Sequence, residues 1–440
     1  MLPIPMVRRH SLGLCAALVA ALGMGPVGGW AVHGAADWPQ WRGPTRTGHP
    51  AADEAPLMTL PASPRVVWSV EAGPGYASPV VAGDRVFVAE AQGGKEVLRA
   101  LDATSGTERW KAVVDETFTD SQGPAAPRCT PVVSEGRVFA QSCRGRLACF
   151  RASDGQPLWA VDYTKDFGAV FVGEKGNSQG AMRHGNNGSP WVEAGWLWAS
   201  AGSTNGAAVV ALDPATGTLR WKSGNEVAAY AAPMVGTLDG VRQVVDFMAD
   251  AAVGFEAQTG RVLWRHPLKT AFSRHVMTPL LLPDRVILGS HQTGLLCLQV
   301  RRDGGRWSVS EAWNSKEAAP NFSCPILVGD RIVGLGPQRE VVCIGRDDGK
   351  LRWRQSGWIT SAADKAHAGF IAAGDSRVLM LTDGGELMLF DTGGTTAREL
   401  GRAQVAGVNW CNPALSGGRL YLRDGWRDTG RWRCVELRTR

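Results

Sequence analysis

Five times along the chain, a glycine is followed by any three residues and then by a tryptophan. The five pairs are Gly106/Trp110, Gly155/Trp159, Gly217/Trp221, Gly260/Trp264 and Gly349/Trp353. Trp68 and Trp313 occupy the same place in the pattern without the glycine, and Leu400 stands where the tryptophan is lost. A unit that recurs every 40 to 60 residues or so indicates a repeat architecture.

Each unit predicts four short strands. The first follows a proline such as Pro79, a Gly/Asp turn leads to a second strand that begins with an arginine such as Arg85, and the third strand ends in Ala-Leu-Asp, as at 100–102. Alternating apolar residues between Gly, Asp and Asn turns are typical of strands, and no stretch of the mature chain sustains a helical period. Four-stranded units repeated around an axis form a β-propeller.

The number of units predicts the number of blades. Complete units start near Ser78, Thr130, Ser189, Ala232, Thr278, Cys324 and Gly369, and an eighth starts at Asn412 without a fourth strand. The strand-like residues 65–70 can supply that strand and remove two exposed sheet edges. We therefore expect an all-β fold, an eight-bladed β-propeller of four-stranded antiparallel blades, the last closed by an N-terminal strand. The expected domains are a signal peptide at 1–36, a wrapping segment at 37–64 and the propeller at 65–440.

The first residues predict export. Arg8 and Arg9 precede an apolar run at 12–24, and small residues follow near Gly34. A Sec-type signal fits this pattern best, and the arginine pair makes the twin-arginine route the second interpretation. The run is short for a membrane span, so no transmembrane segment is expected. Cys15 follows Leu14 rather than a small residue, which disfavours a lipid anchor, so we expect a periplasmic or extracellular protein.

Composition indicates a globular protein with a buried core. Charged residues make up 20% of the chain, hydrophobic ones 44%, and the formal net charge is +6. The arginines are scattered at strand starts, which is typical of a solvated surface and not of a nucleic-acid patch. We expect a monomer that does not bind nucleic acid.

The cysteines after the signal fall into two groups. Cys149, Cys297, Cys343 and Cys434 align with Ala100, Ala211 and Gly254 of other units, which predicts a small buried position rather than a disulfide or metal site. Of the others, only Cys129 and Cys143 lie within reach of each other, and they either form a disulfide or stay free. No His, Cys or carboxylate spacing indicates a metal site.

The recurrent tryptophans have two interpretations. They could form a stacking surface for a ligand, but recurrence once per blade beside a turn favours packing between neighbouring blades. We assign this structural role to Trp68, Trp110, Trp159, Trp221, Trp264, Trp313 and Trp353.

Long connections mark the face on which function is expected. The turns between first and second strands and between third and fourth strands are tight and share one face, here called the turn face. The other connections are long and share the opposite face, here called the loop face, and long loops on a rigid scaffold commonly carry binding sites. Residues just before each innermost strand should converge there, and they either bind a ligand or only satisfy loop backbone: Tyr76, Arg128, His184, Asn186, Asn187, Tyr230, Arg274, His275, Asn321, His367, Asn409 and Trp410.

The Ala-Leu-Asp-x-x-Thr-Gly-x-x-x-Trp unit, clearest at 211–221, resembles the pyrroloquinoline quinone (PQQ)-type repeat. That family includes eight-bladed quinoprotein alcohol dehydrogenases and the outer-membrane assembly lipoprotein BamB. The start Asp37-Trp38-Pro39-Gln40-Trp41-Arg42-Gly43-Pro44 is similar to a secreted group of such propellers. The resemblance covers essentially the whole mature chain, and it implies the fold more strongly than the function.

The resemblance implies two functional classes. As a quinoprotein alcohol or sugar dehydrogenase, the chain would bind PQQ with Ca²⁺, but such enzymes typically carry adjacent cysteines over the cofactor, and this chain has none. A Glu and an Asp cannot be matched to the family's metal and base positions either. The first expectation is therefore an exported binding module or scaffold whose loop face takes a small ligand or a protein partner, with catalytic residues unassigned and enzymatic activity second.

Overall fold

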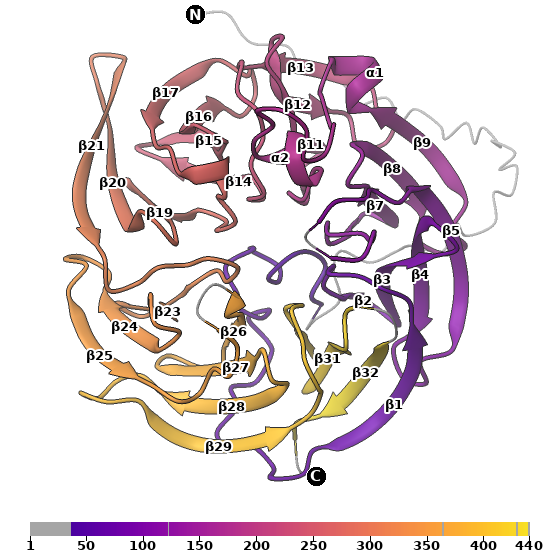
Figure 1. Ribbon diagram of the computed structural model, residues 1–440, viewed down its shortest axis with the longest axis vertical. Helices are drawn as coiled ribbons and strands as arrows, with labels where there is room; N and C mark the ends of the chain where they lie inside the picture. Colours follow the sequence, from indigo (N-terminus) through magenta and orange to yellow (C-terminus); the bar gives the residue numbers. More distant parts are fainter. Residues whose placement is uncertain (1–36, 122, 363–364, 428–429, 439–440) are drawn as a thin grey trace, which may run out of the picture. The chain divides into compact units, whose positions relative to one another are not determined.

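The computed structural model describes residues 37–121, 123–362, 365–427 and 430–438. The expected signal peptide, 1–36, lies outside the described residues. The described chain forms eight separate four-stranded antiparallel sheets arranged as blades of a propeller ring (Figure 1). The predicted fold class and blade number are confirmed.

Blades 1 to 4 follow one another along the chain. Blade 1 contains β2 (Val80–Ala82), β3 (Arg85–Gln92), β4 (Lys95–Asp102) and β5 (Glu108–Glu116). Blade 2 contains β6 (Val132–Ser134), β7 (Arg137–Gln141), β8 (Arg146–Arg151) and β9 (Pro157–Asp162). Blade 3 contains β10 (Trp191–Glu193), β11 (Trp196–Ser203), β12 (Ala207–Leu212) and β13 (Leu219–Ser223). Blade 4 contains β14 (Met234–Leu238), β15 (Val241–Phe247), β16 (Ala251–Glu256) and β17 (Val262–Pro267).

Blades 5 to 8 continue the pattern. Blade 5 contains β18 (Leu280–Leu282), β19 (Arg285–Ser290), β20 (Gly294–Asp303) and β21 (Arg306–Ser315). Blade 6 contains β22 (Ile326–Val328), β23 (Arg331–Leu335), β24 (Val341–Gly345) and β25 (Leu351–Gln355). Blade 7 contains β26 (Ala368–Ala372), β27 (Arg377–Thr382), β28 (Glu386–Asp391) and β29 (Arg398–Gln404). Blade 8 contains β30 (Ala414–Ser416), β31 (Arg419–Asp424), β32 (Gly430–Glu436) and β1 (Arg65–Ala72).

Helices are short and lie in the links between blades. Those in the described residues are α1 (Tyr163–Phe167), α2 (Ala181–His184) and the 3-10 turn η1 (Ala271–Ser273). In the described part of the chain, no helix has the length and apolar character needed to cross a membrane.

The two ends of the chain close the ring as predicted. Strand β1 pairs antiparallel with β32, from Arg65 opposite Glu436 to Ala72 opposite Gly430. The Arg65 Nε atom also donates to Glu436 Oε2 at 3.0 Å. Blade 8 therefore joins strands from opposite ends of the sequence, which lie side by side in Figure 1.

The repeated Ala-Leu-Asp turn positions each blade's tryptophan against the next blade. Asp102 Oδ1 accepts hydrogen bonds from the amides of Thr104 and Ser105, both at 2.9 Å, which fixes the turn that ends in Gly106. Gly106 has φ +74°, and a Cβ placed on it would lie 2.8 Å from the ring of Trp68. The same close approach recurs at Gly155/Trp110, Gly217/Trp159, Gly260/Trp221 and Gly349/Trp313. Each glycine therefore receives the tryptophan of the preceding blade.

Most of the ring nitrogens also bond to the next blade. Trp68 Nε1 donates to Ala103 O at 3.0 Å, and Trp110 Nε1 donates to Ala152 O at 3.0 Å. Trp159, Trp221, Trp313 and Trp353 make equivalent bonds. Trp264 differs because its Nε1 donates to Gln243 Oε1 within its own blade. The next hairpin, β20–β21, runs on to Asp303, and a Cβ added to its turn glycines Gly304 or Gly305 would meet no atom within 4 Å, so this turn does not receive the ring. The blade-packing role is thus observed, with Trp264 as a variant of it.

The small residues of the third strand lie directly opposite the tryptophans. The cross-strand pairs are Ala100/Trp110, Cys149/Trp159, Ala211/Trp221, Gly254/Trp264, Cys297/Trp313, Cys343/Trp353 and Cys434/Trp68. A large ring on one strand requires a small partner on the next, so the cysteines here serve as small apolar residues.

All eight cysteines of the described chain are buried free thiols. The disulfide considered between Cys129 and Cys143 is therefore not formed. Cys129 Sγ donates to Asn186 O at 3.2 Å, and Cys143 Sγ lies 3.7 Å from Ala126 O. Each thiol has its own contacts on the surrounding loops, which orient the two sulfur atoms separately.

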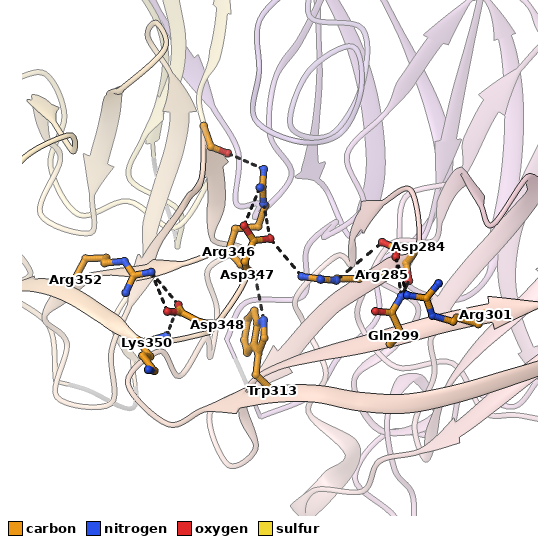
Figure 2. Close-up of polar contacts among 11 residues, drawn as sticks. Asp284, Arg285, Gln299, Arg301, Trp313, Arg346, Asp347, Asp348, Lys350 and Arg352 are labelled. Carbon is orange, nitrogen blue, oxygen red and sulfur yellow. Dashed lines mark hydrogen bonds and ion pairs between the residues drawn. The ribbon is translucent and has the colours of Figure 1, made fainter.

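Ion pairs on the turn face add polar links between blades (Figure 2). Arg285 of blade 5 lies 3.3 Å from Asp347 of blade 6, beside the bond from Trp313 Nε1 to Arg346 O. Within blade 6, Asp348 pairs with Arg352 at 3.0 Å. Exposed pairs of this kind contribute little free energy, so the buried tryptophan contacts dominate the packing.

The first part of the segment 37–64 fills the centre of the ring, and the rest runs outward, where the Leu57 amide donates to Ala373 O and Leu60 packs against Gly401 of the outer strand β29. Trp38 pairs with Val81 of blade 1, and the amide of Val133 in blade 2 donates to Pro39 O at 2.8 Å. The fully buried Arg46 donates from Nη1 to Ser189 O and Pro233 O, both at 2.9 Å. Figure 1 shows this indigo segment crossing the axis before it reaches β1. We call residues 38–48 the plug, because they bond to inner strands or the residues just before them.

Candidate functional site

A cavity of about 170 Å³ lies on the axis of the ring, on the loop face. Every blade contributes to its wall, and the plug contributes Trp41. Trp41 Nε1 donates to Thr278 Oγ1 at 3.1 Å, which holds the indole in place. The lining residues are Trp41, Tyr76, Arg128, Thr130, His184, Asn187, Ser189, Tyr230, Ala232, Arg274, Val276, Thr278, Phe322, His367, Trp410 and Asn412.

Eight of the predicted rim residues line this cavity. They are Tyr76, Arg128, His184, Asn187, Tyr230, Arg274, His367 and Trp410. The structure therefore brings these eight residues together around one cavity.

Four predicted rim residues do not line the cavity: Asn186, His275, Asn321 and Asn409. All four are buried. Asn186 accepts from Gln141 Nε2 at 2.9 Å, Asn409 caps the amide of Cys411 at 3.0 Å, and the His275 ring stacks 4.0 Å from Phe247. Each of the four stands four positions before a blade's first-strand proline, and the contacts of Asn186, His275 and Asn409 are structural.

A simple register separates the two sets. The residue three positions before the proline lines the cavity in seven blades: Tyr76, Arg128, Asn187, Tyr230, Val276, Phe322 and Trp410. Successive side chains of an extended chain point in opposite directions. The residue four positions before the proline therefore points away from the axis. The same register places Thr130, Ser189, Ala232, Thr278 and Asn412, directly before the proline, in the wall. The sequence analysis missed these five together with Val276 and Phe322, although this spacing was visible in the repeat. It also missed Trp41, which lies in the plug, outside the repeat.

An arc of stacked aromatic rings borders one side of the cavity. Phe322 stacks on Trp410 with ring centroids 5.1 Å apart, and Trp410 stacks on Trp426 at 5.1 Å. Tyr76 continues the arc, 5.0 Å from Trp426. Trp426 is buried, whereas the other three rings are partly exposed. The arc offers a large, rigid apolar surface at the rim.

A neutralised charge cluster adjoins the Tyr76 end of this arc. Arg128 forms a bidentate pair with the buried Asp120, at 2.7 and 2.9 Å, and Asp120 also bonds to His184 Nδ1 at 3.1 Å. The guanidinium additionally lies over the Tyr76 ring, 5.4 Å from its centroid. Because Asp120 already occupies Arg128, this arginine is poorly placed to bind an added anion.

Arg274 is the cavity's available cation. It is half-buried, its guanidinium carbon lies 5.6 Å from the Phe322 centroid, and it forms no ion pair with the described residues. Three further polar atoms in the wall, Tyr76 Oη, Tyr230 Oη and His367 Nδ1, are buried without a hydrogen-bond partner among the described residues. Burial lowers the pKa of His367 to about 4, so the ring is neutral near pH 7.

The residues present do not fit a calcium-bound quinone. Ca²⁺ takes six to eight oxygen ligands, with carboxylates prominent among them. In the described ranges, no three His, Cys, Asp or Glu side chains group closely enough to hold a metal, and Asp120 is engaged by Arg128 and His184. We therefore derive no step through this cofactor.

Comparison with known proteins identifies the family. The family model described as "Outer membrane protein assembly factor BamB" matches residues 51–127, 94–355 and 337–433. The BamB of Burkholderia pseudomallei is 24% identical over 375 residues, covering 72% of this chain and 86% of that protein. The BamB of Moranella endobia is 23% identical over 281 residues, covering 64% of this chain and 65% of that protein, so the match spans about two thirds of that relative.

Solved structures show the same fold. The crystal structure of BamB from Moraxella catarrhalis superposes with a TM-score of 0.55 at 15% identity, over 84% of this chain and 99% of that one. The quinohemoprotein alcohol dehydrogenase ADHIIG from Pseudomonas putida superposes with a TM-score of 0.57 at 13% identity, over 91% of this chain and 80% of that one. The likeness to the dehydrogenase shows the fold alone. By the match along most of its sequence, the chain belongs to the BamB family of PQQ-like repeat propellers.

Proposed function

We propose that the protein is a binding scaffold of the cell envelope that engages a protein partner through its loop face. The aromatic arc at the rim carries the proposal. Partly exposed, rigid aromatic rings beside arginines are the chemistry that dominates binding energy in protein interfaces. Membership in the BamB family supports this function and a periplasmic location.

Exposed apolar side chains extend the same face. Val170 and Val172 in the link between blades 2 and 3 are 45% and 42% exposed, and Val408 between blades 7 and 8 is 59% exposed. These valines stand on connections that frame the axis, so a partner could contact both them and the rim. The proposed interface therefore includes the rim arc and the links on either side of it.

A photo-crosslinking amino acid at Val170 tests the proposal in intact cells. A partner on the loop face should give a discrete crosslinked species that disappears when Trp410 is replaced by alanine. Val262 provides a matched control, because it is the same residue type, is 46% exposed and follows a tight turn on the turn face. Crosslinking at both positions alike, or at neither, would contradict a loop-face scaffold.

The competing class is a PQQ-dependent dehydrogenase, although the described residues supply no calcium site. The observation in its favour is Arg274, an available cation in an aromatic-lined cavity, which could meet a carboxylate of the quinone. Titration with PQQ and Ca²⁺, followed by visible absorbance and alcohol-dependent dye reduction, distinguishes the classes. Dye reduction that is lost in Arg274→Ala would establish the enzyme and replace the scaffold as the leading function.

A further inference from the structure

We propose that the loop-face cavity is a binding site for a carboxylate carried on an aromatic group, with Arg274 meeting the carboxylate and the aromatic wall taking the ring. The inference deepens the proposed function, because it names the chemical group that the site would take. It can fail while crosslinking at Val170 still succeeds, so the two failures are distinguishable.

The charge of the site selects an anion. A half-buried guanidinium is costly unless an anion or hydrogen-bond acceptors meet it. Arg128, on the other side of the cavity, has this partner in Asp120, whereas among the described residues Arg274 meets only the face of the Phe322 ring. An arginine matches a carboxylate with two parallel N–H···O bonds. Arg274, which lacks the carboxylate partner that Arg128 has, therefore indicates a bound carboxylate.

The unpartnered polar atoms support the same ligand. Tyr230 and His367 are more than nine-tenths buried, and both line the cavity. Tyr230 Oη and His367 Nδ1 form no hydrogen bond with the described residues. A buried polar group without a hydrogen bond destabilises the folded state. Each can donate a hydrogen bond, and carboxylate oxygens have lone pairs to accept two or more. A carboxylate held by Arg274 would offer acceptors for such donors.

Shape selects an aromatic group of small size. An apolar cavity of about 150 Å³ is known to hold a benzene ring, and the volume here is about 170 Å³. Trp41 comes from the plug and Trp410 from the rim, so flat apolar surfaces reach the cavity from two directions. One six-membered ring with a short carboxylate arm fits this volume.

The chemistry has two sources, and the experiment separates them. The probes are 3-phenylpropanoate, its neutral amide, and a tetrapeptide ending in phenylalanine with either a free or an amidated C-terminus. Ligand-observed NMR titration of the full protein should show saturable binding of both acids and at least tenfold weaker binding of both amides, about 1.4 kcal/mol. Binding of the small acid alone indicates a free metabolite as the source, and binding of the peptide acid alone indicates a protein terminus.

Variants assign the binding to the cavity. Arg274→Gln removes the charge and should weaken either acid about tenfold, while Arg301→Gln, on an exposed part of the same blade, should leave it unchanged. Circular dichroism checks that the variants are folded. The proposal is overturned if acid and amide bind equally to the unaltered protein, if no probe saturates up to about 10 mM, or if folded Arg274→Gln binds normally.

Discussion

The carboxylate of Glu54 accepts a hydrogen bond from the backbone amide of Gly417 at 2.6 Å. It also accepts from the amide of Gly418 at 2.9 Å and pairs with Arg438 at 2.5 Å. Glu54 follows the plug, and Gly417 stands in the turn between β30 and β31 of blade 8. One buried carboxylate therefore fastens the N-terminal segment to the blade that closes the ring.

Replacing Glu54 with glutamine should destabilise the protein. The amide cannot supply a charged acceptor to two backbone amides and an arginine, and hydrogen bonds to charged groups are worth about 1.5–3 kcal/mol. Urea unfolding should show a loss of about 2 kcal/mol or more. Glu116→Gln, which removes an exposed pair with Lys95, should change the free energy by less than about 1 kcal/mol. Equal effects would mean that Glu54 does not fasten the segment.

Two glycines of blade 1 test the tryptophan packing. Gly106 and Gly94 have similar φ values, +74° and +78°, so alanine strains the backbone at both. A Cβ at Gly106 meets the Trp68 ring, whereas a Cβ at Gly94 meets no atom within 4 Å. Thermal unfolding should show about 1 kcal/mol lost in Gly94→Ala and about 1–3 kcal/mol more in Gly106→Ala. No difference between the variants would show that the ring is not tightly seated.

Deprotonation of Asp246 should lower the free energy of unfolding as the pH rises. Burial raises its pKa to about 7, although Ser200 donates to the carboxylate and the charge of Arg46 acts in the opposite direction. The folded state therefore binds more protons than the unfolded chain between pH 4 and pH 7, so this contribution is present at low pH and is lost as pH rises through 7. Asp246→Asn should reduce the loss of stability from pH 5 to pH 8 by on the order of 2 kcal/mol.

That measurement compares variant with unaltered protein because Glu96 acts in the same direction. Burial also raises the pKa of Glu96, to about 8, beside the amide of Cys143. Both proteins retain Glu96, so the difference between their pH profiles belongs to Asp246. Identical profiles would place the Asp246 carboxyl in solvent.

The cysteines should behave as inert core residues. Burial raises the pKa of the thiols of Cys129 and Cys149, and the thiolate is the reactive form. Alkylation of the native protein should be slow, and alkylation after denaturation without reductant should label all eight described cysteines. Peptide mapping that finds Cys129 joined to Cys143 would contradict the free thiols seen here.

The fold was predictable because nearly every blade repeats the same packing contacts, which require particular residue types. Gly106 must be glycine to receive Trp68, and Ala100 must be small to lie opposite Trp110, so the packing leaves its mark on the sequence. The contacts of the plug require no particular residue types in the blades, so the sequence did not predict them. Arg46 bonds to carbonyls of Ser189 and Pro233, and backbone carbonyls carry no residue identity. An arginine that will be buried in this way looks like any surface arginine in the sequence.

The sequence predicted which short segments line the cavity, but not which of two neighbouring residues in each segment faces it. Arg274 and His275 are neighbours, but the first faces the cavity and the second stacks on Phe247. Chemistry alone favoured both, and only the alternation of extended chain, counted from Pro279, separates them. The pairing of Arg128 with Asp120 was hidden for another reason, because the loop that connects them has no fixed geometry in sequence.

The pairing of β1 with β32 determines when the ring can close during folding. Arg65 and Glu436 are 371 positions apart, so the contact between them requires nearly the full chain to be present. Contacts between such distant segments pay a large loop-closure entropy and form slowly. Until then, the outer edges of β32 and blade 8 remain open to strands of other molecules. Ring closure is therefore a late step, which joins a strand made before the seven consecutive blades to strands made after them.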